Sequence, residues 1–193
     1  INVGGGFPSV YPGMEPPPLE DYFSIIYRHF EALPIAYNAE LWCEPGRALC
    51  AEYNSLIVRV EKRRGGELFI NDGAYGALYD AAHVGWPFPV RCLADDRHGE
   101  QEGFSFYGPT CDDADFMEGP FLLPPDIRSG DHIEIGMLGA YGAAMKNDFN
   151  GFGAAGRRRR GWPAARRSRT RARQRPPAAH VGWSLDYPDV AVE

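Results

Sequence analysis

The sequence lacks several features that would assign it quickly to a class of protein. It has only four cysteines in 193 residues, no two of them form a CxxC pair, and no histidines cluster with them, so the usual spacing of a zinc site is not met. No apolar run is long enough to span a membrane, and no signal-peptide pattern is present. These absences predict a cytoplasmic protein with free thiols, no metal site and no membrane partner.

The net charge of −6 hides two unlike parts. Residues 1–153 hold 10 Lys and Arg against 23 Asp and Glu, whereas residues 154–193 hold 10 arginines, all between Arg157 and Arg175, and 3 acidic residues. An acidic body suits a cationic substrate, although acidity is also ordinary for soluble enzymes. The second part is rich in Arg, Ala, Pro and Gly without apolar periodicity, which predicts a disordered basic tail.

Three explanations of the abrupt change in composition stay open. A reading-frame shift in a GC-rich coding region, a nucleic-acid-binding tail and an accessory linker would each produce it. Ten arginines without further structure would bind nucleic acid only non-specifically, through its phosphates.

The first 54 residues are typical of alternating β and α structure. Residues 1–3 indicate the end of a buried strand that runs into a glycine loop, and residues 8–18 hold too many prolines for regular structure. Apolar residues recur at three- and four-residue spacing from Leu19 to Leu33, which predicts an amphipathic helix. With a short strand over residues 39–43, this order matches at most the last quarter of a (β/α) barrel.

From residue 55 the pattern changes to short β-type runs that Gly, Pro and Asp turns separate. Such a pattern predicts an antiparallel sheet or barrel domain. The runs cover residues 56–60, 67–71, 88–93, 103–107 and 132–135.

Seven short motifs occur in order along the acidic part of the chain. Each alone is a weak signal, because Gly- and Pro-rich turns are common. They are Gly4–Pro8, Glu44–Arg47, Asn71–Gly76, Tyr79-Asp80, Gly108–Asp112, Gly139–Tyr141 and Phe149–Phe152. In this order they resemble the pyridoxal-phosphate-dependent ornithine and lysine decarboxylases, which have an alanine-racemase-like barrel.

The resemblance covers Ile1 to Phe152 and implies the C-terminal half of such an enzyme, of fold class α/β plus β. Residues 1–54 would be the last strands and helix of a truncated (β/α)8 cofactor-binding barrel, residues 55–153 a β-barrel domain, and residues 154–193 the basic tail. The lysine that binds the cofactor and the histidine that stacks on it would lie upstream. Neither Lys62 nor Lys146 matches a family motif, and both are interpreted as solvated surface residues. The chain alone is therefore expected to be inactive.

The resemblance assigns pyridoxal 5′-phosphate to the two glycine-rich loops. Backbone N–H groups at Gly5, Gly6 and Gly46 would approach the phosphate closely, and Arg47 would add a charge-assisted fork. The two loops would follow successive strands, where (β/α)8 barrels commonly bind phosphate. Tyr141 would donate its hydroxyl to the same phosphate.

The same resemblance assigns the chemistry and the choice of substrate. Glu44 would keep the cofactor's ring nitrogen protonated, so that the ring can accept electrons. Cys111 would return a proton to Cα after carbon dioxide leaves, whereas the other three cysteines are interpreted as buried and inert. Tyr79, Asp80 and Asp112 would hold the substrate's distal ammonium, because a buried ammonium needs a paired carboxylate.

The predicted function is decarboxylation of ornithine, or of lysine, to a diamine in polyamine biosynthesis. The family's relatives acting on diaminopimelate have Glu-Ser after the cysteine, whereas here Asp112 and Asp113 follow it, which favours a plain diamine end. In the family the Cys-Asp loop and the Phe149–Phe152 motif belong to a two-fold interface, so a homodimer with shared active sites is implied. A decarboxylase for carboxynorspermidine, arginine or diaminopimelate and a non-catalytic regulatory homologue are the alternatives. The sequence does not choose between ornithine and lysine.

Overall fold

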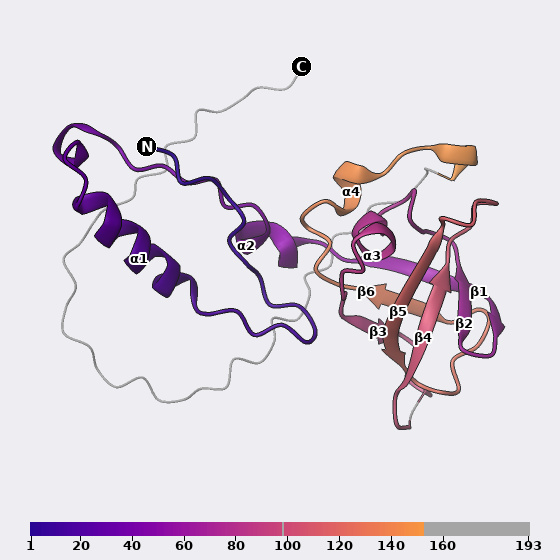
Figure 1. Ribbon diagram of the computed structural model, residues 1–193. Helices are drawn as coiled ribbons and strands as arrows, with labels where there is room; N and C mark the ends of the chain where they lie inside the picture. Colours follow the sequence, from indigo (N-terminus) through magenta and orange to yellow (C-terminus); the bar gives the residue numbers. More distant parts are fainter. Residues whose placement is uncertain (98, 153–193) are drawn as a thin grey trace, which may run out of the picture. The chain divides into compact units, whose positions relative to one another are not determined.

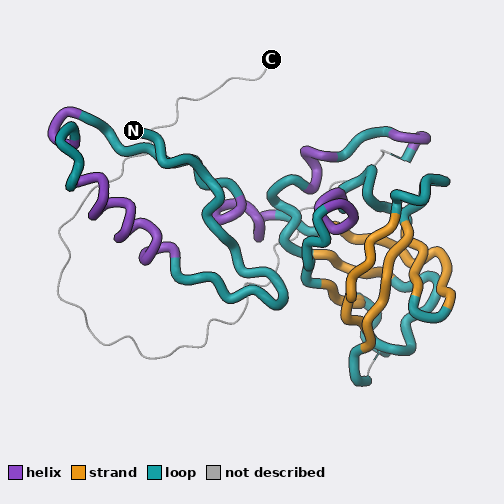
Figure 2. The backbone as a smooth tube through the Cα atoms, in the orientation of Figure 1, coloured by secondary structure: helices purple, strands orange, loops and turns teal. Residues whose placement is uncertain are grey.

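Alternation of apolar and polar residues builds the central sheet of the computed structural model, which describes residues 1–97 and 99–152. The strands are β1 (Leu56–Arg64), β2 (Glu67–Ile70), β3 (Val90–Cys92), β4 (Glu102–Tyr107), β5 (Phe116–Leu123) and β6 (His132–Ile135). They form one sheet in the order β3-β6-β1-β2-β4-β5 (Figures 1 and 2). The edge strands β3 and β5 contact each other, so the sheet nearly closes into a barrel.

Short helices and turns connect and flank this sheet. They are α1 (Leu19–Glu31), α2 (Arg47–Cys50), α3 (Tyr79–His83) and α4 (Gly142–Met145), with 3-10 turns at Ala36–Asn38, Ala51–Tyr53 and Phe149–Gly151. Within the described residues, no helix has the length and apolar character needed to cross a membrane. The predicted basic tail, residues 154–193, lies outside the described residues.

The strand pairing agrees with the predicted β-barrel domain in all but one ladder. Strands β2 and β4 run parallel, with Leu68 opposite Phe106, and the other four pairs are antiparallel. The long connection between β2 and β4 allows the parallel pair, since a two-residue hairpin can join only antiparallel strands. This connection also carries α3 and β3.

Strand β5 was missed by the sequence analysis because Gly119-Pro120 has the composition of a turn. In the structure Gly119 has a φ of +82°, and a Cβ there would lie 2.5 Å from the Phe104 carbonyl oxygen. The register between β4 and β5 shifts beside this position, which is the signature of a bulge. The apolar side chains of β5 that face inward are buried, namely Met117, Phe121 and Leu123.

The apolar core lies inside the nearly closed sheet. Phe106 and Phe121 stack there with ring centroids 4.0 Å apart. Burying one large apolar side chain contributes about 1.5–3 kcal/mol relative to exposure. Fully buried side chains come from most of the strands, including Val58, Val60, Leu68, Ile70, Leu123, Ile133 and Ile135.

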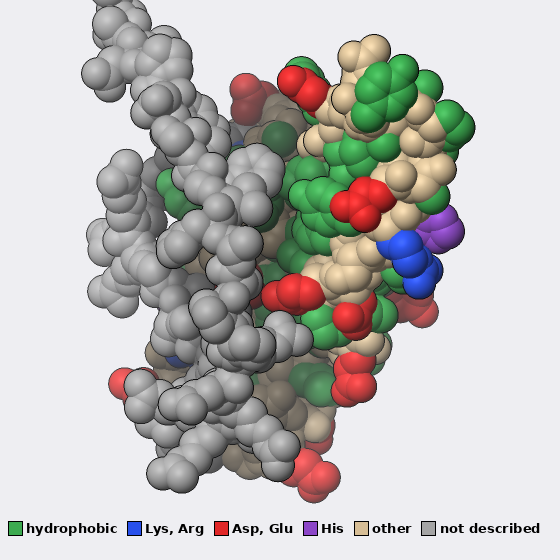
Figure 3. Space-filling view, turned by 90° about the vertical axis from the view of Figure 1, so that its left-hand side faces the viewer, with side chains coloured by type: hydrophobic (Ala, Val, Ile, Leu, Met, Phe, Trp, Pro, Cys, Tyr) green, Lys and Arg blue, Asp and Glu red, His purple; other side chains and the backbone are tan. Residues whose placement is uncertain are grey.

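The first 54 residues bury much less surface. The predicted helix from Leu19 to Leu33 is confirmed as α1, which ends at Glu31. No residue of α1 is buried, and Figure 3 shows hydrophobic side chains open on the face that carries it. The strands predicted over residues 1–3 and 39–43 reduce to one parallel bridge between Asn2 and Trp42, because an isolated parallel pair has no neighbouring strands to support it.

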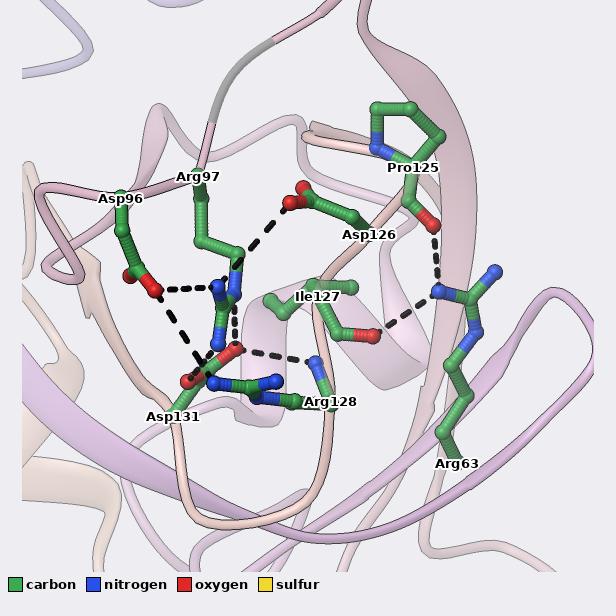
Figure 4. Close-up of polar contacts among 8 residues, drawn as sticks. All are labelled: Arg63, Asp96, Arg97, Pro125, Asp126, Ile127, Arg128 and Asp131. Carbon is green, nitrogen blue, oxygen red and sulfur yellow. Dashed lines mark hydrogen bonds and ion pairs between the residues drawn. The ribbon is translucent and has the colours of Figure 1, made fainter.

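A charged network holds the turn between β5 and β6 (Figure 4). The Arg97 side chain is only 6% exposed, and its nitrogens lie 2.8 Å from Asp96, 2.9 Å from Asp131 and 4.0 Å from Asp126. Burial alone would raise the pKa of Asp131, but the hydrogen bonds from Arg97 and from the Arg128 N–H, with the charges of both arginines, together outweigh burial and lower the pKa below its ordinary 3.8. The hydrogen bond between Arg97 and Asp131 raises the pKa of Arg97.

Arg63 of β1 fixes the same turn through the backbone (Figure 4). Its guanidinium donates hydrogen bonds to the carbonyl oxygens of Pro125 at 2.5 Å and Ile127 at 2.8 Å. These carbonyls have no place in the sheet ladder, so the arginine satisfies groups that would otherwise need water. The turn is therefore anchored by one buried ion pair and one backbone clamp.

Replacing Asp131 by Asn should lower the free energy of unfolding at pH 7 by about 2 kcal/mol, because it leaves a nearly buried arginine without its main partner. Since the pKa of Asp131 is lowered in the folded protein, its stabilisation is present above pH 3.8 and is lost as the pH falls through the folded value. Denaturant unfolding at pH 7 and at pH 3 should therefore show a smaller difference between wild type and variant at pH 3. Asp95→Asn, at an exposed neighbouring acid, is the control; an equal loss in both variants would contradict the assignment.

Candidate functional site

Arg47, the first residue of α2, lies in a pocket of about 290 Å³. The pocket combines residues from the glycine loop with residues that follow α3 and precede α4. It is lined by Gly6, Phe7, Pro8, Ser9, Met14, Arg47, Trp86 and Tyr141. Segments far apart in the sequence therefore meet around one cation.

The guanidinium of Arg47 has two hydrogen-bond partners and two aromatic neighbours. It donates to Asp80 Oδ2 at 2.5 Å and to the Tyr11 hydroxyl at 3.4 Å. Its central carbon lies 4.6 Å from the ring centroids of both Trp86 and Tyr141. Burial disfavours the charge, but the hydrogen bonds to Asp80 and Tyr11 outweigh it and raise the pKa of Arg47. The arginine is thus a fixed, permanent cation.

The two glycine-rich loops lie side by side. Glu44 N–H donates to the Gly4 carbonyl at 2.8 Å, and the Ser9 hydroxyl donates to the Arg47 carbonyl at 2.7 Å. A Cβ at Gly5 would lie 2.5 Å from the carbonyl oxygen of Glu44. Only glycine therefore permits this approach of the two backbones, which brings the first loop to the start of α2.

Tyr141 reaches the pocket through a tight backbone contact. Gly139 N–H donates to the Ala51 carbonyl at 2.9 Å, and a Cβ at Gly139 would collide with the Cys50 carbonyl. Tyr141 itself has a φ of +62° and a ring that is half exposed. The chain thereby turns beside α2 and places this ring on Arg47.

A buried carboxylate, Asp72, shapes the turn that precedes α3. It accepts hydrogen bonds from the N–H groups of Gly73 and Ala77, and from Lys146 Nζ at 3.2 Å. The Lys146 side chain is only 16% exposed. The interpretation of Lys146 as a solvated surface residue was therefore wrong, because its charge is paired with a buried acid.

A second buried carboxylate, Asp115, joins two of the sequence motifs. It accepts from the Ala74 N–H at 2.7 Å and from the Thr110 hydroxyl at 2.7 Å and N–H at 3.0 Å. The motifs of residues 71–76 and 108–112 are thus hydrogen-bonded to one side chain. Their relative position depends on that carboxylate.

Cys111 and Asp112 form a separate, exposed cluster. The Tyr75 hydroxyl donates to Asp112, and its ring stacks on Phe149 with centroids 4.3 Å apart. Asn150 Nδ2 lies 3.4 Å from the Cys111 sulfur. The hydrogen bond from Tyr75, with one from a backbone N–H, lowers the pKa of Asp112, and the same bond raises the pKa of Tyr75.

The structure therefore brings some predicted site residues together and leaves others apart. Gly6, Arg47 and Tyr141 line one pocket, and Asp80 is hydrogen-bonded to Arg47. Cys111 does not line it.

Three further predicted residues also lie outside the pocket lining. Asp112 belongs to the exposed cluster, and the Tyr79 ring contacts the His83 ring at a tilt, with centroids 4.5 Å apart. Glu44 is exposed and accepts from Asn2 Nδ2 at 2.5 Å. Their predicted roles stay predictions.

The expectation of three buried cysteines was wrong. Cys43 is exposed, and Cys50 and Cys92 are half-buried. Cys43 follows the single parallel bridge, where no second layer covers it. All four cysteines are free thiols.

Two aromatic residues of the site, Tyr11 and Trp86, were missed from the sequence, and a third, Tyr75, lay in the motif of residues 71–76 without an assigned role. Tyr11 is 2% exposed and donates to the Met137 carbonyl at 3.2 Å, while Trp86 and Tyr75 contact predicted site residues. Each belongs to a Gly- or Pro-rich stretch without apolar periodicity. The sequence signal that could have identified them is a large aromatic residue within such a stretch.

Comparison with known proteins finds relatives of this fold among the pyridoxal-dependent decarboxylases. Residues 48–139 match the family model for the pyridoxal-dependent decarboxylase C-terminal sheet domain. The chain is 27% identical over 156 residues to lysine/ornithine decarboxylase of Selenomonas ruminantium (79% of this chain, 38% of the relative). It is 31% identical over 159 residues to diaminopimelate decarboxylase of Helicobacter pylori (78% and 36%).

A solved structure supports the same class. The lysine/ornithine decarboxylase of Vibrio vulnificus complexed with cadaverine is similar with a TM-score of 0.65 and 29% identity, over 78% of this chain and 40% of that chain. Residues 48–139 therefore belong to the pyridoxal-dependent decarboxylase family, as its C-terminal sheet domain. The chain spans about two fifths of the length of these relatives.

Replacing Tyr75 by Phe should raise the pKa of Asp112 toward its ordinary value, because the hydroxyl that stabilises the carboxylate is removed while the ring stack on Phe149 is kept. Carboxyl ¹³C shifts followed by NMR across pH 2–6 would measure the change. Tyr79→Phe is the matched control, since the Tyr79 ring contacts His83 instead. An unchanged titration of Asp112 in Tyr75→Phe would show that the hydrogen bond is not formed in solution.

Proposed function

We propose that this chain supplies the C-terminal part of a pyridoxal-phosphate-dependent decarboxylase that converts ornithine or lysine to a diamine. The observation that carries the proposal is the Arg47 pocket, where two glycine-rich loops meet beside the carboxylate of Asp80. An anion-binding group and a cation-binding group are thus adjacent. A substrate with a distal ammonium, bound next to a phosphate-bearing cofactor, needs that pair.

The residues present fit the cofactor's phosphate. Gly6 lines the pocket with a φ of +82°, and Gly5 has no room for a side chain against the second loop. Arg47 is held at the pocket by its partners, so it would not lose much freedom on binding an anion. Gly46 and Tyr141 flank it, with Tyr141 in the pocket lining.

Glu44 is proposed to act on the cofactor's ring. Pyridoxal phosphate, when bound, accepts the electron pair released as carbon dioxide leaves. Glu44 follows the parallel bridge and lies against Gly5, and it would keep a proton on the ring nitrogen. Asn2, which donates to its carboxylate, would orient it.

The substrate's distal ammonium would pair with Asp80 from one copy of the chain and Asp112 from a second copy. Asp112 is exposed and outside the Arg47 pocket, as is Cys111. A two-fold dimer would bring this exposed cluster to the partner's pocket, which supports the proposal of shared sites. Cys111 would then return the proton to Cα.

Diaminopimelate is the second candidate substrate, because the relative from Helicobacter pylori that is 31% identical is named for it. The acids at Asp112 and Asp113 favour a plain ammonium instead, since a carboxylate beside them would be repelled. Diaminopimelate differs from lysine by a second carboxylate on the carbon that bears the distal amine. The rates on diaminopimelate and on ornithine or lysine therefore distinguish the two candidates.

The activity can be tested by joining residues 1–152 to the N-terminal part of the Selenomonas ruminantium enzyme in place of its own C-terminal part. We expect carbon dioxide release from ornithine and lysine, with a much lower rate on diaminopimelate. Asp112→Asn should raise the Michaelis constant for ornithine about tenfold or more, because a neutral amide leaves the ammonium poorly paired. Asp95→Asn, at an exposed acid outside both clusters, is the control. A preference for diaminopimelate, or equal effects of the two variants, would reject the proposed substrate.

In the same chimera Cys111→Ala should alter the product, since protonation at Cα would become unreliable while cofactor binding persists. The ratio of amine to aldehyde product, measured by chromatography, should fall at least several-fold. Cys92→Ala, in β3 and outside both clusters, should leave the ratio unchanged. An unaltered ratio in Cys111→Ala would remove this thiol from the mechanism.

A further inference from the structure

Arg47 is proposed to bind the cofactor's phosphate, and Asp80 the substrate's distal ammonium. In this structure the two side chains bind each other. Their ion pair is 2.5 Å long, and their side chains are 19% and 13% exposed. A carboxylate this close lowers the attraction of Arg47 for a phosphate, and the arginine equally lowers the attraction of Asp80 for an ammonium. Each group therefore partly blocks the other's ligand.

Helix α3 supplies Asp80, and the turn that follows it supplies the ring of Trp86 that lies over Arg47. The Asp80 carbonyl accepts from the N–H of Val84 at 3.1 Å and of Trp86 at 3.0 Å. Gly85 has a φ of +65°, which lets the chain reverse after α3. The carboxylate and the indole are thus parts of one rigid unit, with Arg47 against both.

The Trp86 side chain is held by ring contacts, without a hydrogen bond from its indole N–H among the described residues. Its ring meets Tyr11 edge-on at 5.2 Å, and its Nε1 is buried without a hydrogen-bond partner among the described residues. A buried indole N–H usually finds a partner. Its ring lies over the guanidinium of Arg47 and lines the pocket, so the position serves the contact with Arg47.

We propose that Trp86 is a positioning residue that holds Arg47 where its charge is shared between Asp80 and a bound phosphate. This inference rests on the proposed function for the identity of the ligands. A phosphate that draws on Arg47 frees Asp80 for an ammonium, and an ammonium on Asp80 frees Arg47 for a phosphate. Binding of the two ligands is therefore mutually favourable, and the coupling is equal in both directions.

The test measures phosphate binding at Arg47 in the full chain of 193 residues, with and without putrescine. The ten arginines from Arg157 to Arg175 would also attract phosphate, so the reporter must be residue-specific. The Nε–Hε NMR resonance of Arg47, assigned by its loss in Arg47→Lys, serves this purpose. Inorganic phosphate is the anion probe, and 1,4-butanediol is the uncharged match for putrescine.

We expect putrescine to tighten phosphate binding at Arg47 by about fivefold or more, and butanediol to have no effect. Asp80→Asn should tighten phosphate binding without any amine and abolish the effect of putrescine. Asp95→Asn, at an exposed acid outside the pocket, should behave as wild type. If Asp80 had only a structural role, its replacement would not tighten phosphate binding at Arg47.

Trp86→Leu should weaken phosphate binding at Arg47 by roughly tenfold, because the cation–π contact and the stacking surface are lost. Trp86→Phe should restore most of it, since a ring is present again and no hydrogen bond is lost with the indole N–H. Equal weakening in both variants would show that the indole is needed only for packing and would overturn its positioning role.

The coupling is overturned if phosphate does not move the Arg47 resonance, or if its affinity is the same or lower in Asp80→Asn. Failure of the proposed function is a different result. In that case the chimera would release no carbon dioxide from any diamino acid, while phosphate and putrescine would still strengthen each other at Arg47. The two measurements therefore separate the two statements.

Discussion

Two buried carboxylates hold the loops on which the candidate site depends. Asp72 and Asp115 are 7% and 2% exposed, and they bind backbone N–H groups that no strand ladder satisfies. A buried N–H or carboxylate without a hydrogen bond would destabilise the folded protein, and these hydrogen bonds avoid that penalty. The turn before α3 and the Cys111 loop therefore keep their shapes as long as these side chains keep their hydrogen bonds.

The second constraint is electrostatic. Arg47 and Asp80 join the α2 region to the sheet domain through an ion pair that is mostly removed from water. Such a pair gains little net stability over an apolar contact, but losing one partner leaves an uncompensated charge. The pair thus favours one arrangement of the two segments, and the aromatic rings of Trp86 and Tyr141 limit the alternatives further.

The two parts of the described chain differ in how much of their apolar surface they bury. The sheet buries a continuous core, whereas no residue of α1 is fully buried and its apolar side chains are half-buried or exposed. The family match lies within the better-packed part, over residues 48–139. The glycine loop that precedes α1 nevertheless contributes to the Arg47 pocket, so the candidate site draws on both parts.

The sequence alone determined the features that depend on neighbouring residues. Periodicity predicted α1 and five of the six strands, and the motif order predicted the family. It did not predict β5, because Gly119-Pro120 carries a turn signal that a bulge beside Phe104 overrides. Nor did it predict that Arg47 pairs with Asp80, since the two lie far apart in the chain. Only the folded sheet brings them within hydrogen-bonding distance, because such contacts depend on packing between segments and leave no local pattern.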